Sequence, residues 1–141
     1  MRDIRPHIYL ALDQIFAIAY VVVILKVIPN RLPSATIHLW TIPIGMEVMA
    51  IGTASVFVPA LRAKGRWVAI AGGSVVLLST IVMIARVLVS AAFLAGVYGA
   101  FGQAAATFAL VAVALIVEAV ALLPVVQVKY LMSRAGRRAF A

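Results

Sequence analysis

Long runs of apolar residues alternate along the chain with short polar or basic segments. The first run covers about residues 8–28 and ends at a segment with two prolines, which lack the backbone N–H that a helix interior needs. The second run covers about residues 37–61, and the basic segment 62–66 follows it. Gly65 in that segment favours the end of a helix. The pattern therefore predicts two helices with helix-breaking residues after each.

The apolar stretch that follows is too long for one helix and long enough for two. Three glycines, Gly96, Gly99 and Gly102, interrupt it, and glycine adopts the backbone conformations of tight turns more readily than other residues. We therefore predict a third helix over about residues 67–94 and a fourth over about 104–131. The third is longer than a membrane span requires, so we expect it to tilt or protrude.

All four predicted helices are long enough to cross a membrane, because about 20 apolar residues span the ~30 Å hydrocarbon core. The composition agrees with this interpretation. Of the 141 residues 66% are hydrophobic and 11% are charged, whereas soluble domains are about 25% charged. The sequence predicts an all-α membrane protein in which residues 1–141 form a single transmembrane domain, a four-helix transmembrane bundle.

Basic residues lie mainly at the ends of the apolar segments, on the side that would hold both termini. Nine lie there: Arg2, Arg5, Arg62, Lys64, Arg66, Lys129, Arg134, Arg137 and Arg138. Only Lys26 and Arg31 lie on the opposite side. Cytoplasmic segments of membrane proteins carry the excess of lysine and arginine, so both termini should face the cytoplasm. This distribution explains the net charge of +8 without a nucleic-acid partner.

Four ionisable residues interrupt the apolar helices and need an explanation. They are Asp13, Glu47, Arg86 and Glu118. An ionised side chain at the membrane centre costs roughly 2.5–3.5 kcal/mol, so such residues pair, line a wet cavity or carry out a function. By helix rise, Glu47 and Glu118 should lie near the midplane, Asp13 nearer the cytoplasmic side and Arg86 nearer the outer side.

Small residues lie beside both glutamates at helical spacing. Ala50 follows Glu47 by three positions, and Ala121 follows Glu118 by the same distance. Small residues mark the faces on which membrane helices approach one another closely. We expect both glutamates to point into the bundle or into an oligomer contact, and not at lipid.

Two functions fit these residues. The first is a small proton- or cation-linked transporter or channel in a bacterial inner membrane. In it Glu47 and Glu118 would titrate, Asp13 would lie at the cytoplasmic mouth, and Arg86 would set how readily the acids release protons. The alternative is a non-catalytic accessory subunit of a larger membrane complex, in which the same groups pair between helices or subunits. Either function leads us to expect a homo-oligomer or other membrane subunits as partners, within the lipid bilayer.

Several other chemistries lack their residues in this sequence. The absence of cysteine excludes disulfides and thiolate metal sites. No phosphate-binding glycine loop or nucleophile motif is present. His7 and His38 should lie near opposite membrane faces, which disfavours a haem held by both. We therefore expect neither cofactor nor metal, and an enzyme remains possible only through the acids.

Overall fold

Every element in the described part of the protein is a helix or a helical turn. The computed structural model describes residues 3–26 and 40–141, and no residue in these ranges lies in a strand, so the predicted all-α class is confirmed. In chain order the elements are α1 (Arg5–Lys26), α3 (Thr41–Ala54), the 3-10 turns η2 (Ser55–Phe57) and η3 (Pro59–Leu61), α4 (Arg62–Val97), α5 (Gly99–Met132) and α6 (Arg134–Ala139).

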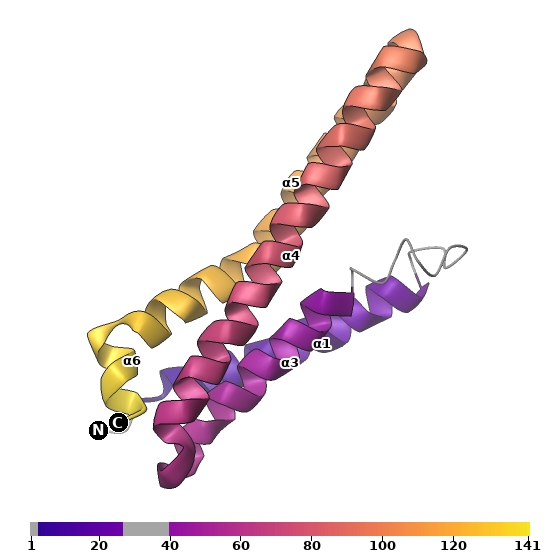
Figure 1. The fold of residues 1–141 in the computed structure, drawn as a ribbon. Coiled ribbons are helices and arrows are strands. Elements are labelled where there is room, and N and C mark those ends of the chain that lie inside the picture. The colour runs from indigo at the N-terminus through magenta and orange to yellow at the C-terminus, as the bar shows by residue number, and fades with distance from the viewer. Residues whose placement is uncertain (1–2, 27–39) are drawn as a thin grey trace.

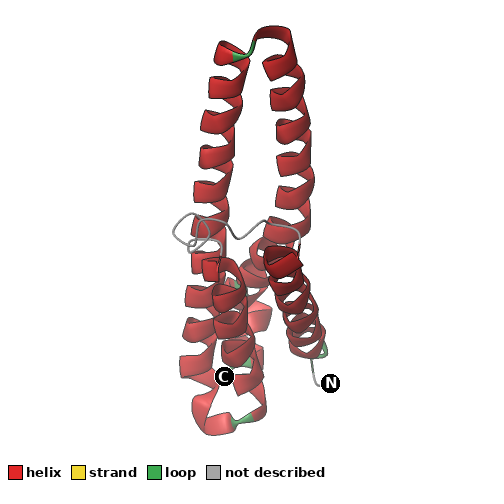
Figure 2. Ribbon diagram, turned by 90° about the vertical axis from the view of Figure 1, so that its right-hand side faces the viewer, coloured by secondary structure: helices red, strands yellow, loops and turns green. Residues whose placement is uncertain are grey.

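The two longest helices, α4 and α5, form a hairpin, and α1 and α3 pack beside one half of it (Figure 1). α3 contacts both α1 and α4. Both chain termini, α6 and the α3–α4 connection lie together at one end of the molecule (Figure 1). We call this the terminal end and define it as residues 3–9, 55–66 and 129–141. Figure 2 shows the other half of the hairpin extending beyond the remaining helices.

The predicted second helix, 37–61, is shorter in the structure. α3 ends at Ala54, and the chain tightens into a 3-10 turn before Val58, whose backbone is extended with φ −115° and ψ 104°. A residue before proline disfavours the α conformation. Pro59 therefore breaks the helix, and residues 37–39 lie outside the described ranges.

The third predicted helix starts earlier than expected. α4 begins at Arg62 and contains Gly65, so the expectation that Gly65 ends a helix is wrong. Its absent side chain makes room, because a Cβ at Gly65 would overlap the side chain of Ser55. The predicted turn at the three glycines is confirmed at Gly99, whose φ of 58° L residues rarely adopt.

The other helix boundaries lie close to the predicted ones. The first predicted helix, 8–28, corresponds to α1, although residues 27 and 28 lie outside the described ranges. The fourth, 104–131, corresponds to α5 and begins five residues later than α5 does. At ~1.5 Å per residue, α1 is roughly 33 Å long, whereas α4 and α5 are each more than 50 Å long. The sequence analysis did not predict α6.

Glycines bring α3 and α4 into backbone contact. Gly45 on α3 faces Gly72 on α4, and Gly52 faces Gly65. On each helix the two glycines are seven residues apart. A Cβ on Gly72 would lie 2.5 Å from the backbone nitrogen of Met49, and one on Gly52 would lie 2.6 Å from the carbonyl oxygen of Gly65. Such close approach is typical of helix pairs packed through small residues.

The buried apolar side chains form two clusters. One joins all four long helices and contains Ala17, Tyr20, Ile24, Ile42, Met46, Val76 and Val120. The other lies toward the terminal end and contains Met49, Ala69, Tyr130, Leu131 and Phe140. Because Phe140 belongs to the second cluster, the last residues of the chain are held against α3, α4 and α5.

Much of the outer surface is apolar. On the free half of the hairpin Phe93, Phe101 and Phe108 are exposed, an arrangement that soluble proteins rarely tolerate over a large area. Two stretches of described helix, Arg5–Lys26 and Pro59–Val97, are long and apolar enough to cross a membrane. Length and composition thus support membrane association.

The backbone contact between α3 and α4 predicts that adding one methyl group at a contact glycine lowers the stability of the protein. Gly72→Ala should destabilise the protein by about 1–3 kcal/mol, because the new Cβ meets immobile backbone. Gly96→Ala is the matched control on the same helix, since no atom lies within 4 Å of a Cβ at Gly96. It should be neutral or slightly stabilising, because alanine favours helices. Thermal unfolding in detergent measures both, and equal unfolding temperatures would contradict the inferred contact.

Candidate functional site

A fully buried polar cluster joins three helices. Asp13 on α1 is 0% exposed, and Gln127 on α5 donates a hydrogen bond from Nε2 to its Oδ2 over 2.8 Å. The same Nε2 donates to Oγ1 of Thr53 on α3 over 3.1 Å. Thr53 in turn donates to the carbonyl oxygen of Met49 over 2.8 Å, so the cluster is anchored to the α3 backbone.

The spacing of buried residues on α1 explains why Asp13 points inward. Pro6, Asp13, Ala17, Tyr20 and Ile24 are the buried residues of this helix. Their separations of seven, four, three and four residues place them on one stripe. An apolar stripe of this kind packs against a core, so the carboxyl group of Asp13 is carried into the interior with its apolar neighbours.

Two oxygens in the cluster lack hydrogen-bond donors. Oδ1 of Asp13 and Oε1 of Gln127 are buried and have no partner among the described residues. Each belongs to a group that already takes part in the 2.8 Å hydrogen bond between the two side chains. A buried acceptor without a donor costs about 1–3 kcal/mol, and more if it is charged. A positive charge bound at either oxygen would offset the cost at that oxygen.

Glu47 lies close to this cluster but outside the interior. It is exposed on α3, and its Oε2 accepts a hydrogen bond of 3.1 Å from Nε2 of Gln14. Gln14 follows Asp13 directly in the sequence, so the two acids are linked through adjacent residues of α1. Glu47 also lines an apolar groove of about 420 Å³ between α1 and α3, together with Trp40 and other residues.

The other two predicted site residues, Glu118 and Arg86, do not belong to the Asp13 cluster. Glu118 is exposed on α5, and Arg86 is exposed on α4 one turn beyond Met83. Neither Glu47 nor Glu118 points into the interior of this chain, so the predicted bundle-facing orientation does not hold for a single copy. The oligomer contact, which the sequence left as the other alternative, stays a prediction.

A second polar cluster lies nearer the chain ends. Asp3 accepts hydrogen bonds at Oδ1 from the backbone nitrogen and Nε of Arg5, both over 3.0 Å, and at Oδ2 from the hydroxyl of Tyr130 over 2.7 Å. The guanidinium of Arg5 lies 4.7 Å from the centre of the Tyr130 ring. The hydrogen bond from Arg5 and, secondly, that from Tyr130 lower the pKa of Asp3 from 3.8 to about 2, although partial burial opposes the shift.

A pair of tyrosines, one of which belongs to the second polar cluster, lies next to the buried Asp13 cluster. The rings of Tyr9 and Tyr130 lie 5.3 Å apart, centre to centre. Tyr9 precedes Asp13 by four residues on α1, and Tyr130 follows Gln127 by three on α5, so each tyrosine lies about one helical turn from the buried cluster. The tyrosine pair is therefore the part of the terminal end that lies next to the Asp13 cluster.

The sequence analysis found Asp13 but missed its partner. Gln127 is an uncharged amide in an apolar run, and its only signal was that a polar side chain within such a helix needs a buried partner. Thr53 gave less signal, because threonine can satisfy its hydroxyl on its own helix.

Metal-binding residues do not gather in the described part of the chain. No group of three or more histidine, cysteine, aspartate or glutamate side chains could hold a metal ion there. His7 packs edge-on against the ring of Phe57 at 4.9 Å, and His38 lies outside the described ranges. Among the described residues, the two buried oxygens without donors, Oδ1 of Asp13 and Oε1 of Gln127, are the candidate acceptors for a positive charge.

Comparison with known proteins gives no further guide to the site. No family model matches the chain, and no curated protein or solved structure is significantly similar to it. Functional inference therefore depends on the residues and their geometry.

The polar cluster of Asp3, Arg5 and Tyr130 predicts how one substitution changes the pKa of Asp3. Tyr130→Phe removes the hydroxyl that donates to Asp3 and keeps the aromatic ring, so the pKa of Asp3 should rise from about 2 toward 3.8. The chain contains two aspartates, and ¹³C labelling of their carboxyl carbons gives two NMR signals that Asp13→Asn assigns.

The same titration has a control and a consequence for stability. Tyr20→Phe should leave the pKa of Asp3 unchanged, because the Tyr20 hydroxyl contacts the Met83 sulfur and not Asp3. Since folding lowers this pKa, Asp3 stabilises the fold above pH 3.8, and the contribution is lost as the pH falls through 2. If Tyr130→Phe left the titration of Asp3 unmoved, the assigned hydrogen bond would be wrong.

Proposed function

We propose that this chain is a four-span membrane protein with both termini in the cytoplasm, and that it links proton or cation movement to the buried carboxyl group of Asp13. The observation that carries the proposal is the pair of buried oxygens, one on Asp13 and one on Gln127, that lack donors. The location is proposed to be a bacterial inner membrane.

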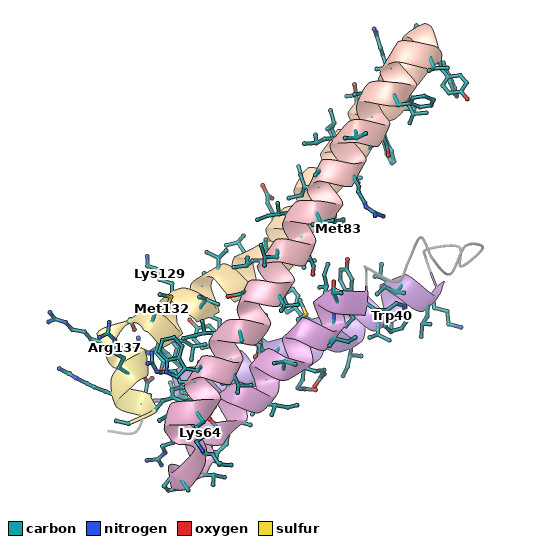
Figure 3. The ribbon with its side chains drawn as sticks, viewed as in Figure 1. Trp40, Lys64, Met83, Lys129, Met132 and Arg137 are labelled. Carbon is teal, nitrogen blue, oxygen red and sulfur yellow. The ribbon has the colours of Figure 1, made fainter. Side chains whose placement is uncertain are left out.

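The distribution of helices and charge supports the four-span topology. Two stretches are long and apolar enough to span, and two further apolar stretches, Thr41–Phe57 and Gly99–Ala112, are shorter. The second of these is the start of α5, which continues to Met132. Figure 3 shows Lys64, Lys129 and Arg137 near the terminal end, with Trp40 toward the opposite end of α3. This one-sided basic charge is typical of a cytoplasmic face.

The chemistry of the site is reversible binding of one positive charge. In the empty state Asp13 is a buried carboxylate whose one hydrogen-bond donor, among the described residues, is the amide of Gln127. A proton that arrives at Oδ1 makes the group a neutral acid, which removes the cost of a buried charge. A small cation coordinated by the carboxylate would offset the same charge. Release returns the carboxylate, which the low-dielectric interior disfavours, so binding is favoured until the site opens to water.

Glu47 is the second carboxylate that we propose to bind the transported charge. It is exposed and is joined to α1 through the hydrogen bond from Gln14, the neighbour of Asp13. A carboxylate at the surface of the same helix pair can accept the charge that Asp13 releases. Glu118 and Arg86 take no direct part in this step.

The test is the substitution Asp13→Asn. The Asn amide is nearly isosteric and supplies an N–H where the acid proton would be, so the protein should fold and keep its thermal stability. Proton or cation flux into liposomes that contain the purified protein should be abolished. Glu118→Gln neutralises another carboxylate outside the cluster and should retain flux.

The state of Asp13 can be measured directly in the wild type. A protonated carboxylic acid gives a carbonyl stretch in the infrared that Asp13→Asn removes, and this band should be present at neutral pH in sodium-free buffer. A band that appears only after sodium is removed would assign a metal cation to the site. Flux that persists in Asp13→Asn would reject the proposal.

A second candidate function follows from the exposed acids. Glu47 and Glu118 lie on the outer surface of helices in apolar surroundings, where an ionised group is costly. Contacts with basic groups of other subunits would offset this cost. The chain would then be an accessory subunit of a larger complex.

The mass of the assembly separates the two functions. The protein is extracted gently from its native membrane and weighed by native mass spectrometry. A homo-oligomer of this chain favours the transporter or channel, whereas larger partners in fixed ratio favour the accessory subunit. In the second case Glu47→Gln with Glu118→Gln should release the partners, because the buried ion pairs are broken. Partners retained by that double variant would count against the acids as contacts.

A further inference from the structure

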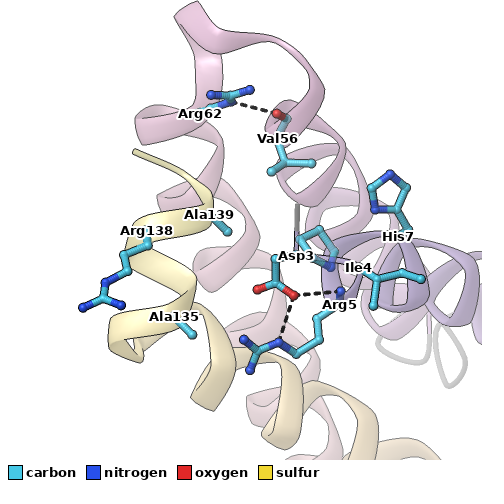
Figure 4. A pocket seen from close by; sticks show the side chains of 10 residues that line it. Asp3, Ile4, Arg5, His7, Val56, Arg62, Ala135, Arg138 and Ala139 are labelled. Atoms are coloured by element: carbon cyan, nitrogen blue, oxygen red, sulfur yellow. Dashed lines mark hydrogen bonds and ion pairs between the residues drawn. The ribbon is translucent and has the colours of Figure 1, made fainter. Parts of the chain in front are cut away.

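A cavity of about 640 Å³ opens at the terminal end, away from the Asp13 cluster. It lies between the start of α1, η2, the start of α4 and α6 (Figure 4). Segments from the beginning, middle and end of the sequence thus meet around one hollow. Its lining includes the charged side chains of Asp3, Arg5, Arg62 and Arg138.

The charges of the lining do not cancel. Asp3 already accepts hydrogen bonds from Arg5 at 3.0 Å, so this pair is internally neutral. Arg62 uses Nε to donate to the carbonyl oxygen of Val56 over 2.8 Å, which leaves its two terminal nitrogens with their N–H donors. Arg138 lies at the rim on α6 with an exposed side chain (Figure 4). Two guanidinium groups therefore remain in excess.

The position of the cavity favours an anion that carries phosphate. α1, one of the helices long enough to span a membrane, begins at Arg5, so the cavity lies at the end of a span, where lipid headgroups are found. Arginine binds phosphate oxygens through two parallel N–H donors. Apolar side chains, Ile4, Pro6 and Val56, also line the cavity and suit the neutral part of an amphiphile.

We propose that this cavity binds a phosphate-bearing anion, which is attracted by the excess positive charge of Arg62 and Arg138. This site shares no residue with the Asp13 cluster and does not depend on transport, although the choice of a lipid headgroup rests on the proposed membrane topology. A phospholipid headgroup and a soluble phosphate carry the same chemistry, and the experiment distinguishes these sources.

The experiment compares two double variants of the full chain in detergent. Arg62→Gln with Arg138→Gln removes both excess guanidinium groups. Lys64→Gln with Arg137→Gln is the matched control, because it removes the same charge from the same end, and both residues are exposed and lie outside the cavity lining. Phosphatidylglycerol, phosphatidylcholine and inorganic phosphate are titrated in turn. Bound lipid is counted by native mass spectrometry, and the unfolding temperature is recorded.

Phosphatidylglycerol should bind and raise the unfolding temperature of the wild type, with zwitterionic phosphatidylcholine much weaker. The Arg62 and Arg138 double variant should lose about tenfold or more in affinity, and the control should lose far less. Inorganic phosphate that stabilises the wild type, with the same variant dependence, would support the site and assign it to a soluble ligand.

Other outcomes overturn the proposal. Equal losses in the two double variants would show general charge attraction and no site, and no binding by any probe would reject it outright. If Arg62→Gln fails to fold because Val56 loses its donor, Arg138→Gln against Arg137→Gln decides the question. These neighbours on α6 are both exposed, and only Arg138 lines the cavity.

Discussion

The close approach of α3 to α4 is the contact on which the rest of the structure depends. Four glycines remove the side chains that would separate the two backbones, and a Cβ at Gly52 or Gly72 would meet main-chain atoms of the other helix. α3 is short and lacks charged ends, so packing, not capping, holds it in place. α1 packs on α3, and Thr53 of α3 contacts Gln127, so the buried polar cluster exists only while this helix stays against α4.

The buried cluster around Asp13 lowers the stability of the fold, whereas the packing of α3 on α4 raises it. A hydrogen bond of 2.8 Å between Asp13 and Gln127 joins helices 114 residues apart in sequence, but two buried oxygens remain without donors. Such a network specifies how α1 lies against α5 and costs stability for as long as it stays incomplete. In the proposed transport, a positive charge taken up at Asp13 would offset part of this cost.

The helices could be predicted from the sequence, because long apolar runs and helix-breaking residues are local features. The turn at Gly99 was found in this way, and the same reasoning failed at Gly65, where glycine serves a contact with Ser55 instead of ending a helix. A pattern along one helix cannot show which segment will approach it. For the same reason Asp13 was recognised as unusual from the sequence, while its hydrogen bond to Gln127 was not, because no local pattern connects the two residues.

Three interactions along α1 and α5 lie in order from the cavity at the terminal end to the Asp13 cluster. From the terminal end inward lie the Asp3–Arg5 pair, the Tyr9–Tyr130 ring pair and the Asp13–Gln127 hydrogen bond. Pro124 interrupts α5 three residues before Gln127 and removes a backbone hydrogen bond there, which makes this the position at which α5 bends most easily. A bend at Pro124 would move Gln127 and Tyr130 together, because both lie on the segment that follows it. Because Gln127 donates to Asp13 and the ring of Tyr130 lies 5.3 Å from that of Tyr9, the segment after Pro124 carries these contacts of α5 with α1.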